Sequence, residues 1–554
     1  MLKIIKALIV ICSILHFDLT MGQTKSCVEP KNAPLCPNSG STLLDETYPV
    51  QSFVISTEGY RTNKGNSSTS NYRENNIQLP ASFVSSIILG YSENFPEILV
   101  PTQIGEDFDL LKNEVTKKLL SSGFPQTQID LSISKIKRVD DAAYTWQQDY
   151  FESFVDLETG RPNLRAMSSY DKHSAASSTK SLGDALSCGT TGKPLTNLKM
   201  GVGGFGELNK AKDTYIKDKF NGGRSWGSGE MGGNIEGLPG GLCLKGNNQA
   251  NDFVSQYCGS AENFVEVDVG WLEVGHVDEL VKVVPTRPKV APEECNFSVM
   301  VASPDAGLEA LKNPEFANRP FIELGTKDAA LIKARIDEIV NSKANKVLCN
   351  AFKDVDSAPK KNDNSIKSKA IKAFYNILSI NSFTAYAGGN VLSTSGCAKK
   401  LAEVTNRQMF DLLMNDPDFV ETNKLVQIKM NKAKADMAAK LKQRLPQCTN
   451  IKFIDAPDIF HNTYFAEIDG VKQLPEPGRA GSIFPNPTNS VLANETMIVS
   501  ETPNKAFNDI VKGQLKNSGL KTAFVDTWNY AHSGDGNMHC SSHSIPYCQP
   551  RGKK

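Results

Sequence analysis

Apolar residues recur along the chain with the two spacings that distinguish strands from helices. The run Ile98–Val100 is typical of a short buried strand. The residues after it are apolar at every third or fourth position, as on one helix face: Phe108, Leu111, Val115 and Leu119. Leu131 and Ile133 alternate as in a strand, and Ile136 follows them. This region predicts a strand–helix–strand unit that ends at the acidic segment 140–149.

Similar units recur in the second half of the chain. A long basic helix is predicted from Phe419 to Leu445, where Pro446 ends it, and its lysines are expected to face solvent. The other predicted elements are a strand at Val299–Ala302, helical spacing at Leu331 or Ile332, Ile336 and Ile339, a strand at Ile451–Asp455, helical spacing at Phe507, Val511 and Leu515, and a strand at Ala523–Val525. The pattern predicts a mixed α/β fold without a fixed sequence period.

Two stretches interrupt this pattern and are interpreted as insertions or long functional loops. The first, Thr159–Lys199, is rich in serine, threonine and glycine. The second, Asn221–Leu242, holds nine glycines in twenty-two residues. Glycine lets main-chain carbonyls approach a ligand closely, and loops of this length are commonly functional.

The overall composition excludes several classes of protein. The chain has 554 residues, of which 40% are hydrophobic, and its 61 Lys and Arg residues balance 61 Asp and Glu residues. This neutral charge gives no reason to expect a nucleic-acid partner. No apolar run reaches the roughly 20 residues of a membrane-spanning helix, so no stable membrane anchor is expected.

The first residues have the layout of a secretory signal peptide. Lys3 and Lys6 precede the apolar stretch Ala7–Phe17, and cleavage is predicted near Gly22. The alternative is a retained amphipathic or anchoring helix. We therefore expect a secreted or periplasmic protein with a signal peptide at residues 1–22.

Export would place the cysteines in an oxidising compartment, where pairing is favoured. Removal of Cys12 with the signal peptide leaves eleven of the twelve cysteines, so one thiol is expected to remain free. In a secretory pathway that glycosylates, three asparagines would accept glycans: Asn66, Asn296 and Asn494.

Three segments carry residues suited to catalysis. After the alternating valines Val265, Val267 and Val269, His276 and Asp278 stand two positions apart and share one face if the strand continues. Such a pair suits acid–base catalysis, although a lone strand histidine is more often structural.

The second segment runs from Trp146 to Glu152. It combines an indole, Gln148 and Asp149 with a second carboxylate. These groups suit a guanidinium clamp or hard oxygen ligands for calcium. A polar turn after a buried tryptophan is the alternative.

The third segment is a glycine-bearing loop that ends in His539-Cys540, followed by His543. Cationic neighbours favour a nucleophilic thiolate. The alternative is a structural disulfide, with Cys548 close by in sequence.

Together these segments resemble the protein-arginine deiminase family. The resemblance extends in family order from about residue 80 to the C-terminus. Shorter similarities lie at Val299–Pro304, Phe453–Pro457 and Phe484–Asn486. The motifs that carry it are Trp146-x-Gln148-Asp149 with Glu152, Gly233–Glu236, Trp271–Glu279 (WLEVGHVDE) and His539-Cys540.

The resemblance implies a pentein fold, a five-fold pseudosymmetric α/β propeller, over residues 76–554, after a short extension at 23–75. It implies that Cys540 is the nucleophile and His276 the general acid/base. Asp149 and Asp278 would clamp the substrate guanidinium, and Trp146 would line the side-chain tunnel. The implied activity is the hydrolysis of protein-bound arginine to citrulline, with proteins or peptides that carry arginine as partners.

The resemblance also implies a calcium ion as cofactor, held by Gln148, Glu152 and Glu236 with the carbonyls of Gly232 and Ile235. Three departures from the animal enzymes bear on this reading. Tyr150 stands where a second acidic ligand is expected, so a second calcium ion is not implied. The stretch Gly201–Gly206 lacks the arginine that grips the substrate main chain. The two amino-terminal immunoglobulin-like domains of those enzymes are not expected, because only some fifty residues precede the implied propeller.

Two other hypotheses stay open at this point. The same scaffold and cysteine would also serve a deiminase of free arginine, agmatine or methylated arginine. Alternatively, the chain is a secreted binding protein that has lost turnover. With Cys540 free, ten cysteines remain for five disulfides, whereas a Cys540–Cys548 bridge would abolish the mechanism.

Overall fold

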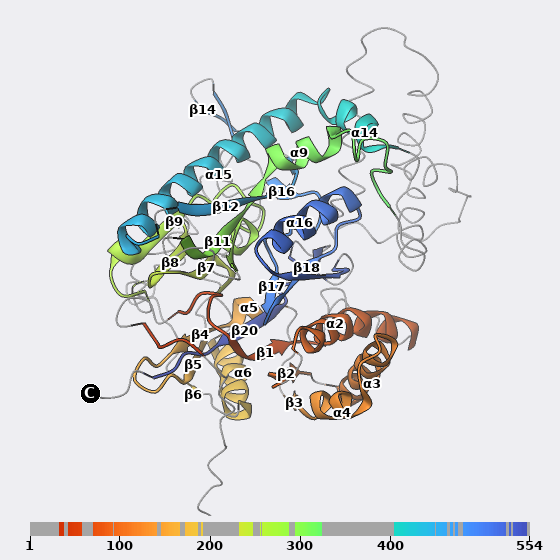
Figure 1. Cartoon of the computed structure of the whole chain (residues 1–554), viewed down its shortest axis with the longest axis vertical. Coiled ribbons are helices and arrows are strands. Elements are labelled where there is room, and N and C mark those ends of the chain that lie inside the picture. The colour runs from red at the N-terminus through yellow and green to blue at the C-terminus, as the bar shows by residue number, and fades with distance from the viewer. Residues whose placement is uncertain are drawn as a thin grey trace, which may run out of the picture.

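The computed structural model gives a mixed α/β protein (Figure 1). No helix in the described part of the chain combines the length and the apolar character needed to cross a membrane. The described residues are 33–37, 43–57, 70–91, 94–102, 104–140, 146–166, 172–186, 190–191, 232–247, 255, 258–286, 294–323, 404–448, 450–462, 466–468, 471–474, 480–527, 531–532 and 536–550.

Five sheets in these ranges have at least three strands, and all five begin in the same way. An antiparallel pair comes first, and the next strand joins in parallel. The predicted recurrence of strand–helix–strand units therefore has a structural counterpart in a repeated sheet pattern.

Four of these sheets have three strands. Their members are β4 (Phe151–Val155), β5 (Pro162–Ala166) and β6 (Thr190–Thr191); β7 (Ile235–Leu238), β8 (Leu242–Gly246) and β9 (Phe264–Val267); β10 (Val281–Pro285), β11 (Glu294–Ser303) and β12 (Asn450–Pro457); and β17 (Val491–Ala493), β18 (Thr496–Ser500) and β19 (Lys521–Val525).

The fifth sheet joins the two ends of the described chain. Its order is β20 (Ser542–Pro546), β1 (Val50–Ile55), β2 (Glu97–Pro101) and β3 (Ile136–Val139). It thus takes one strand from the segment that the sequence analysis assigned to an extension. A disulfide between Cys36 and Cys548 links the same two ends.

Two further pairs of strands complete the sheets. They are β13 (Phe460–Asn462) with β16 (Ala480–Ser482), and β14 (Ala466–Ile468) with β15 (Val471–Gln473). Disulfides Cys243–Cys258 and Cys295–Cys448 also lie in the described part of the chain.

Three helices group beside the fifth sheet: α2 (Ser70–Gly90), α3 (Gly105–Ser121) and α4 (Gln126–Ser134) (Figure 1). The prediction of strand β2 and helix α3 is confirmed, with Leu111, Val115 and Leu119 buried. The prediction of a strand at Leu131 and Ile133 is wrong, because both lie in α4. That helix turns Ile129 and Ser132 inward and leaves Leu131 53% exposed, so the apparent alternation did not mark a buried face.

The long basic helix is confirmed as α15 (Pro417–Arg444). Its carboxylate N-cap, Asp416, accepts hydrogen bonds from the main-chain N–H groups of Asp418 and Phe419. The buried face of α15 packs on the cores of β9 and β11, and Figure 1 shows the helix lying across these strands.

Three other helices lie near the sheet of β10, β11 and β12: α9 (Pro304–Lys312), α14 (Asn406–Leu413) and α16 (Lys505–Asn517). Helices α9 and α16 contact β12, and α14 contacts α9. The predicted strands in β11, β12 and β19 and the predicted helix α16 are confirmed. The helical spacing predicted at residues 331–339 lies outside the described residues.

The interpretation of Thr159–Lys199 as an insertion or loop is wrong for much of its length. Strands β5 and β6 belong to a sheet with β4, and α6 (Lys172–Ala185) connects them. The low hydrophobicity of the segment hid these elements, because β5 alternates buried and partly exposed residues over only five positions and gives no long pattern. The predicted signal peptide at residues 1–22 and the stretch Gly201–Gly206 lie outside the described residues.

Candidate active site

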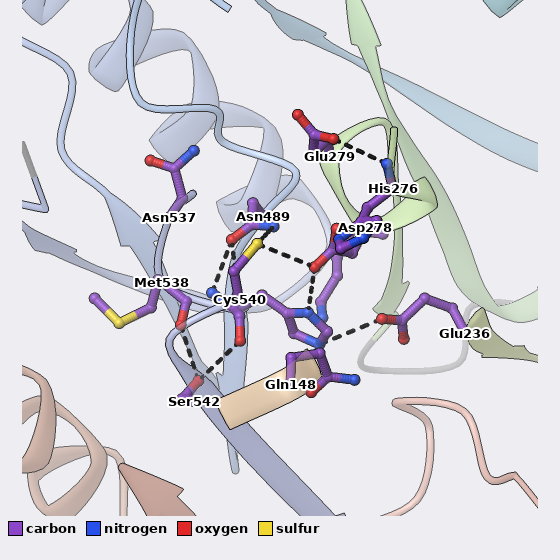
Figure 2. A network of polar contacts seen from close by, with 12 residues as sticks. Gln148, Glu236, His276, Asp278, Glu279, Asn489, Asn537, Met538, Cys540 and Ser542 are labelled. Atoms are coloured by element: carbon purple, nitrogen blue, oxygen red, sulfur yellow. Dashed lines mark hydrogen bonds and ion pairs between the residues drawn. The ribbon is translucent and has the colours of Figure 1, made fainter. Parts of the chain in front are cut away.

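Cys540 lies in the turn that immediately precedes β20, with only 4% of its surface exposed (Figure 2). It is a free thiol, whereas its sequence neighbour Cys548 pairs with Cys36. The structure thus rejects the alternative of a Cys540–Cys548 bridge, and the expectation that Cys540 is free is confirmed.

The surroundings of the sulfur are largely anionic. The Oδ2 atom of Asp278 lies 3.4 Å from Sγ, and the side-chain amide of Asn489 donates to Sγ at 3.1 Å. Burial, followed by the charges of Asp278 and Asp149, raises the pKa of the Cys540 thiol well above its usual value. The thiol form is therefore favoured until a cation enters beside it.

His276 and Asp278 approach this thiol from a turn, not from a strand. Strand β9 ends at Val267, and His276 caps the 3-10 turn η4 (Val277–Glu279). The Glu279 carboxylate accepts a hydrogen bond from the main-chain N–H of His276 at 3.0 Å. The strand therefore does not continue to His276, which was the condition for a shared strand face, yet both side chains are 99% buried in the same site.

Asp149 completes the group from the short helix α5 (Gln147–Tyr150). Its Oδ1 atom lies 3.7 Å from Nδ1 of His276. Burial raises the pKa of Asp149 to about 6, an effect that His276 partly offsets and Asp278 adds to. A buried carboxyl whose pKa is raised by burial and by a neighbouring carboxylate favours the binding of a cation.

Glycines allow these segments to approach one another. A Cβ atom at Gly233 would lie 2.8 Å from Nδ1 of His276 and 3.1 Å from Oδ2 of Asp278. At Gly536, a Cβ atom would lie 2.3 Å from the ring of Trp146. The site accordingly has no space for side chains at these two positions, which explains why both are glycine.

A second group of polar residues lies beside the thiol. The Nδ1 atom of His539 is 2.9 Å from Oδ2 of Asp278, and its Nε2 atom is 3.5 Å from Oε1 of Glu236. Glu236, Asp278 and His539 each offer a ligand atom within 4.8 Å of the others. Within the described residues, this is a group that could hold a metal ion.

The predicted calcium ligands Gln148, Glu152 and Glu236 border the same region. Burial and the Glu236 charge raise the pKa of Glu152, and burial raises that of Glu236 to about 7 despite the opposing charges of His539 and Lys282. Two carboxylates that are costly to ionise together suit a hard divalent cation.

The predicted main-chain ligands lie in the turn η2 (Gly232–Asn234) and at the start of β7. Gly232 packs so closely that a Cβ atom there would lie 2.0 Å from the main-chain oxygen of Gln148 and 3.0 Å from Oε2 of Glu152. The residues therefore fit a calcium site in both chemistry and proximity.

His543 is a further member that sequence reasoning noticed without assigning a role. Its Nδ1 atom lies 2.7 Å from Oε1 of Gln148, and its Nε2 atom lies 3.6 Å from Oε1 of Glu152. Burial lowers the pKa of His543 to about 3, so its ring is neutral. It orients Gln148 without adding charge to the carboxylate group.

Sequence reasoning missed Asn489, although it noted the nearby motif Phe484–Asn486. Asn489 is fully buried and bonds to the loop of the nucleophile. Its neighbour Thr488 donates to the carbonyl of Glu279 at 2.7 Å, which ties this segment to η4. No spacing signal marks such a residue, because its partners are distant in sequence.

Fold and site together define an α/β protein with a buried centre of one cysteine, three histidines and several carboxylates. The described residues thus bring together the sequence-predicted members Trp146, Asp149, His276, Asp278 and Cys540, next to Gln148, Glu152 and Glu236. The side chain of Tyr150 lies outside the described part.

The family model described as protein-arginine deiminase (PAD) matches residues 231–547. The chain belongs to the protein-arginine deiminase family, whose members are hydrolases that act on guanidino C–N bonds. No curated protein matches the chain.

Two solved structures similar to the chain are agmatine deiminases. The one from C. jejuni is 12% identical with a TM-score of 0.42, and the match covers 92% of this chain and 96% of that chain. The one from Enterococcus faecalis is 10% identical with a TM-score of 0.35, and covers 93% and 99%. The family assignment therefore depends on the family match alone.

Proposed function

We propose that the protein hydrolyses protein-bound arginine to citrulline and ammonia through a covalent intermediate on Cys540. One observation carries this proposal: a free, buried thiol lies beside two buried carboxylates and a histidine that come from three distant segments. The family provides the substrate class, because its description names protein arginine.

Asp149 and Asp278 would bind the guanidinium. Oδ1 of each carboxylate has no hydrogen-bond partner among the described residues, and both atoms are buried. A guanidinium offers paired N–H donors in the geometry that carboxylates accept. Its positive charge would offset the raised pKa of Asp149 and favour the thiolate of Cys540.

The reaction then proceeds in two balanced steps. The Cys540 thiolate forms a bond to the guanidinium carbon, and the C–N bond breaks as protonated His276 donates a proton to the leaving ammonia. Water next loses a proton to neutral His276 and attacks the same carbon. The C–S bond breaks with its electron pair on sulfur, which restores the thiolate. The hydroxyl proton of the adduct passes to the released ammonia, which leaves as ammonium, and the citrulline carbonyl forms.

We further propose that calcium assists this reaction. Gln148, Glu152 and Glu236 would hold the ion together with the carbonyls of Gly232 and Ile235. A bound calcium ion supplies fixed positive charge that balances the buried carboxylates. The proposed calcium site adjoins the nucleophile through Gln148, because the main-chain N–H of Gln148 donates to the Cys540 carbonyl at 3.2 Å. The bond-forming and bond-breaking steps are carried out by the residues of the chain.

Two finer expectations belong to the same proposal. The five sheets with a common pattern support a closed five-bladed pentein propeller around the site. The three disulfides support export to an oxidising compartment after removal of a signal peptide, because such bonds persist mainly there.

The test is the formation of citrulline and ammonia from a blocked arginine peptide, with calcium or with a chelator, beside Cys540→Ala. Calcium-dependent turnover that is lost in the variant is the expected result. Turnover that survives chelation would refute the role of calcium and keep the chemistry. Turnover of free arginine or agmatine, with none on the peptide, would overturn the substrate class.

A further inference from the structure

Asn489 contacts the nucleophile through both ends of its side-chain amide (Figure 2). It lies in the segment between β16 and β17 and is fully buried. Its Oδ1 atom accepts hydrogen bonds from the main-chain N–H groups of His539, at 2.8 Å, and Cys540, at 3.3 Å. Its Nδ2 atom lies 3.1 Å from the Cys540 sulfur.

These contacts fix the direction of the amide. A main-chain N–H can only donate, so the atom that faces His539 and Cys540 must be the oxygen. The NH₂ group is therefore the end that faces the sulfur, and it can only donate there. If the amide were rotated, its NH₂ group would face the main-chain N–H groups of His539 and Cys540. Donors would then oppose donors, which is unfavourable in a buried site.

The remaining neighbours of the sulfur make this donor valuable. Asp278 places a carboxylate oxygen 3.4 Å from Sγ, and Asp149 adds a second negative charge nearby. The main-chain N–H of Asn537 also bonds to the sulfur. Asn489 thus adds a side-chain donor to the main-chain donor of Asn537, at an atom whose charged neighbours are carboxylates.

We propose that Asn489 is a further catalytic residue, whose amide donates a hydrogen bond to the Cys540 sulfur whenever that sulfur carries negative charge. Only the role of this donor in the hydrolysis step rests on the proposed function. In the attack, the hydrogen bond holds the anionic sulfur in place. In the hydrolysis step, the C–S bond breaks and its electron pair returns to sulfur, and the same donor stabilises the charge that develops there.

Asn489→Asp separates this role from a structural one. The carboxylate has the same shape and still accepts from His539 and Cys540, but it loses the donor and adds a negative charge beside the sulfur. We expect the rate constant for alkylation of Cys540 by iodoacetamide, at fixed pH and calcium concentration, to fall about 10- to 100-fold. Loss of a hydrogen bond to a charged group has this magnitude.

Asn489→Ala removes the donor without adding charge, and provides a second measurement if the aspartate variant does not fold.

Asn423→Asp is the matched control. Asn423 is a buried asparagine that also accepts from a main-chain N–H, that of Phe460, at 2.9 Å, and donates to main-chain carbonyls. It should lose thermal stability while the alkylation rate of its folded form stays unchanged.

Alkylation rates within twofold of wild type in a folded Asn489→Asp or Asn489→Ala variant would overturn the proposal. With an arginine peptide, we expect kcat of these variants to fall about 100-fold while KM changes only a fewfold. Equal losses in kcat for Asn423→Asp would also contradict it. The alkylation assay needs no arginine substrate, so it decides this inference even if the proposed function fails.

Discussion

The sulfur of Cys540 lies 3.4 Å from Oδ2 of Asp278, although 262 positions separate the two residues in sequence. The same oxygen also pairs with Nδ1 of His539 at 2.9 Å. Burial alone would raise the pKa of Asp278, but the hydrogen bond and charge of His539 outweigh it and hold that pKa below its usual value. Asp278 is thus an anion that depresses the reactivity of the thiol until a cation binds.

This relationship predicts opposite effects of Asp278→Asn on two measurements. Removal of the negative charge lowers the pKa of the Cys540 thiol, so alkylation by iodoacetamide at neutral pH should become faster. Removal of a guanidinium ligand should lower kcat/KM on an arginine peptide by about 100-fold or more. A variant with slower alkylation would show that Asp278 does not suppress the thiol.

Gly233 offers a steric test of the site. In Gly233→Ala, the added methyl group would meet Nδ1 of His276 at 2.8 Å and Oδ2 of Asp278 at 3.1 Å, so we expect turnover to fall at least tenfold. Gly513→Ala is the control, because a Cβ atom in this position of α16 meets nothing within 4 Å. It should retain full turnover and raise stability by up to about 1 kcal/mol. Equal turnover in the two variants would contradict the close packing at Gly233.

The carboxylates beside the thiol predict that calcium binding depends on pH. Burial raises the pKa of Glu236 to about 7 and that of Glu152 well above its usual value. Below these pKa values the carboxylates hold protons, which a calcium ion must displace, so affinity should rise from pH 6 to pH 8. Calorimetric titration in two buffers of different ionisation enthalpy measures both the affinity and the protons released.

The variant Glu236→Gln tests the same prediction, because it removes a carboxylate that can release a proton when calcium binds. It should weaken calcium binding at least tenfold and reduce the number of protons released. Affinity that is independent of pH in the wild-type protein, or unchanged in Glu236→Gln, would remove Glu236 from the proposed calcium ligands.

Asp458 predicts a pH dependence of stability away from the active site. Burial raises its pKa to about 8, and its Oδ1 atom accepts from the hydroxyl of Ser482 and the N–H of Ile459. The unfolded carboxyl has a pKa of about 3.9. Between these values the folded state binds more protons than the unfolded state, so the free energy of unfolding should decrease as pH rises from about 4 to 8.

Asp458→Asn keeps the Oδ1 acceptor and cannot ionise. Its free energy of unfolding relative to wild type should therefore increase from pH 5 to pH 8, by an amount on the order of a few kcal/mol. Urea denaturation at both pH values measures this difference. A constant difference between variant and wild type would show that Asp458 does not titrate in this range.

The sequence predicted most accurately where local patterns were long and regular. Helix α15 follows from its spacing, because it buries one continuous face. Strands β2, β11 and β12 follow from short apolar runs. The helix α4 was missed because its short apolar pattern fits two periods equally well, and Leu131 is exposed. Strands β5 and β6 were missed because they are short: β5 alternates over only five residues, and β6 consists of two threonines.

The sequence by itself determined which residues carry the chemistry. Trp146–Glu152, His276 with Asp278, and His539-Cys540 are recognisable because the nature and spacing of their side chains are local properties. The odd cysteine count likewise pointed to a free thiol, but it did not say which cysteine was free.

Only the tertiary structure decided how these residues meet. The turn at His276, the pairing of Cys36 with Cys548 and the amide of Asn489 beside Cys540 all depend on contacts between segments far apart in the chain. Such contacts form when distant elements pack and bury polar groups that must then find partners. No local pattern records them, because the partner of each group is chosen by the fold as a whole.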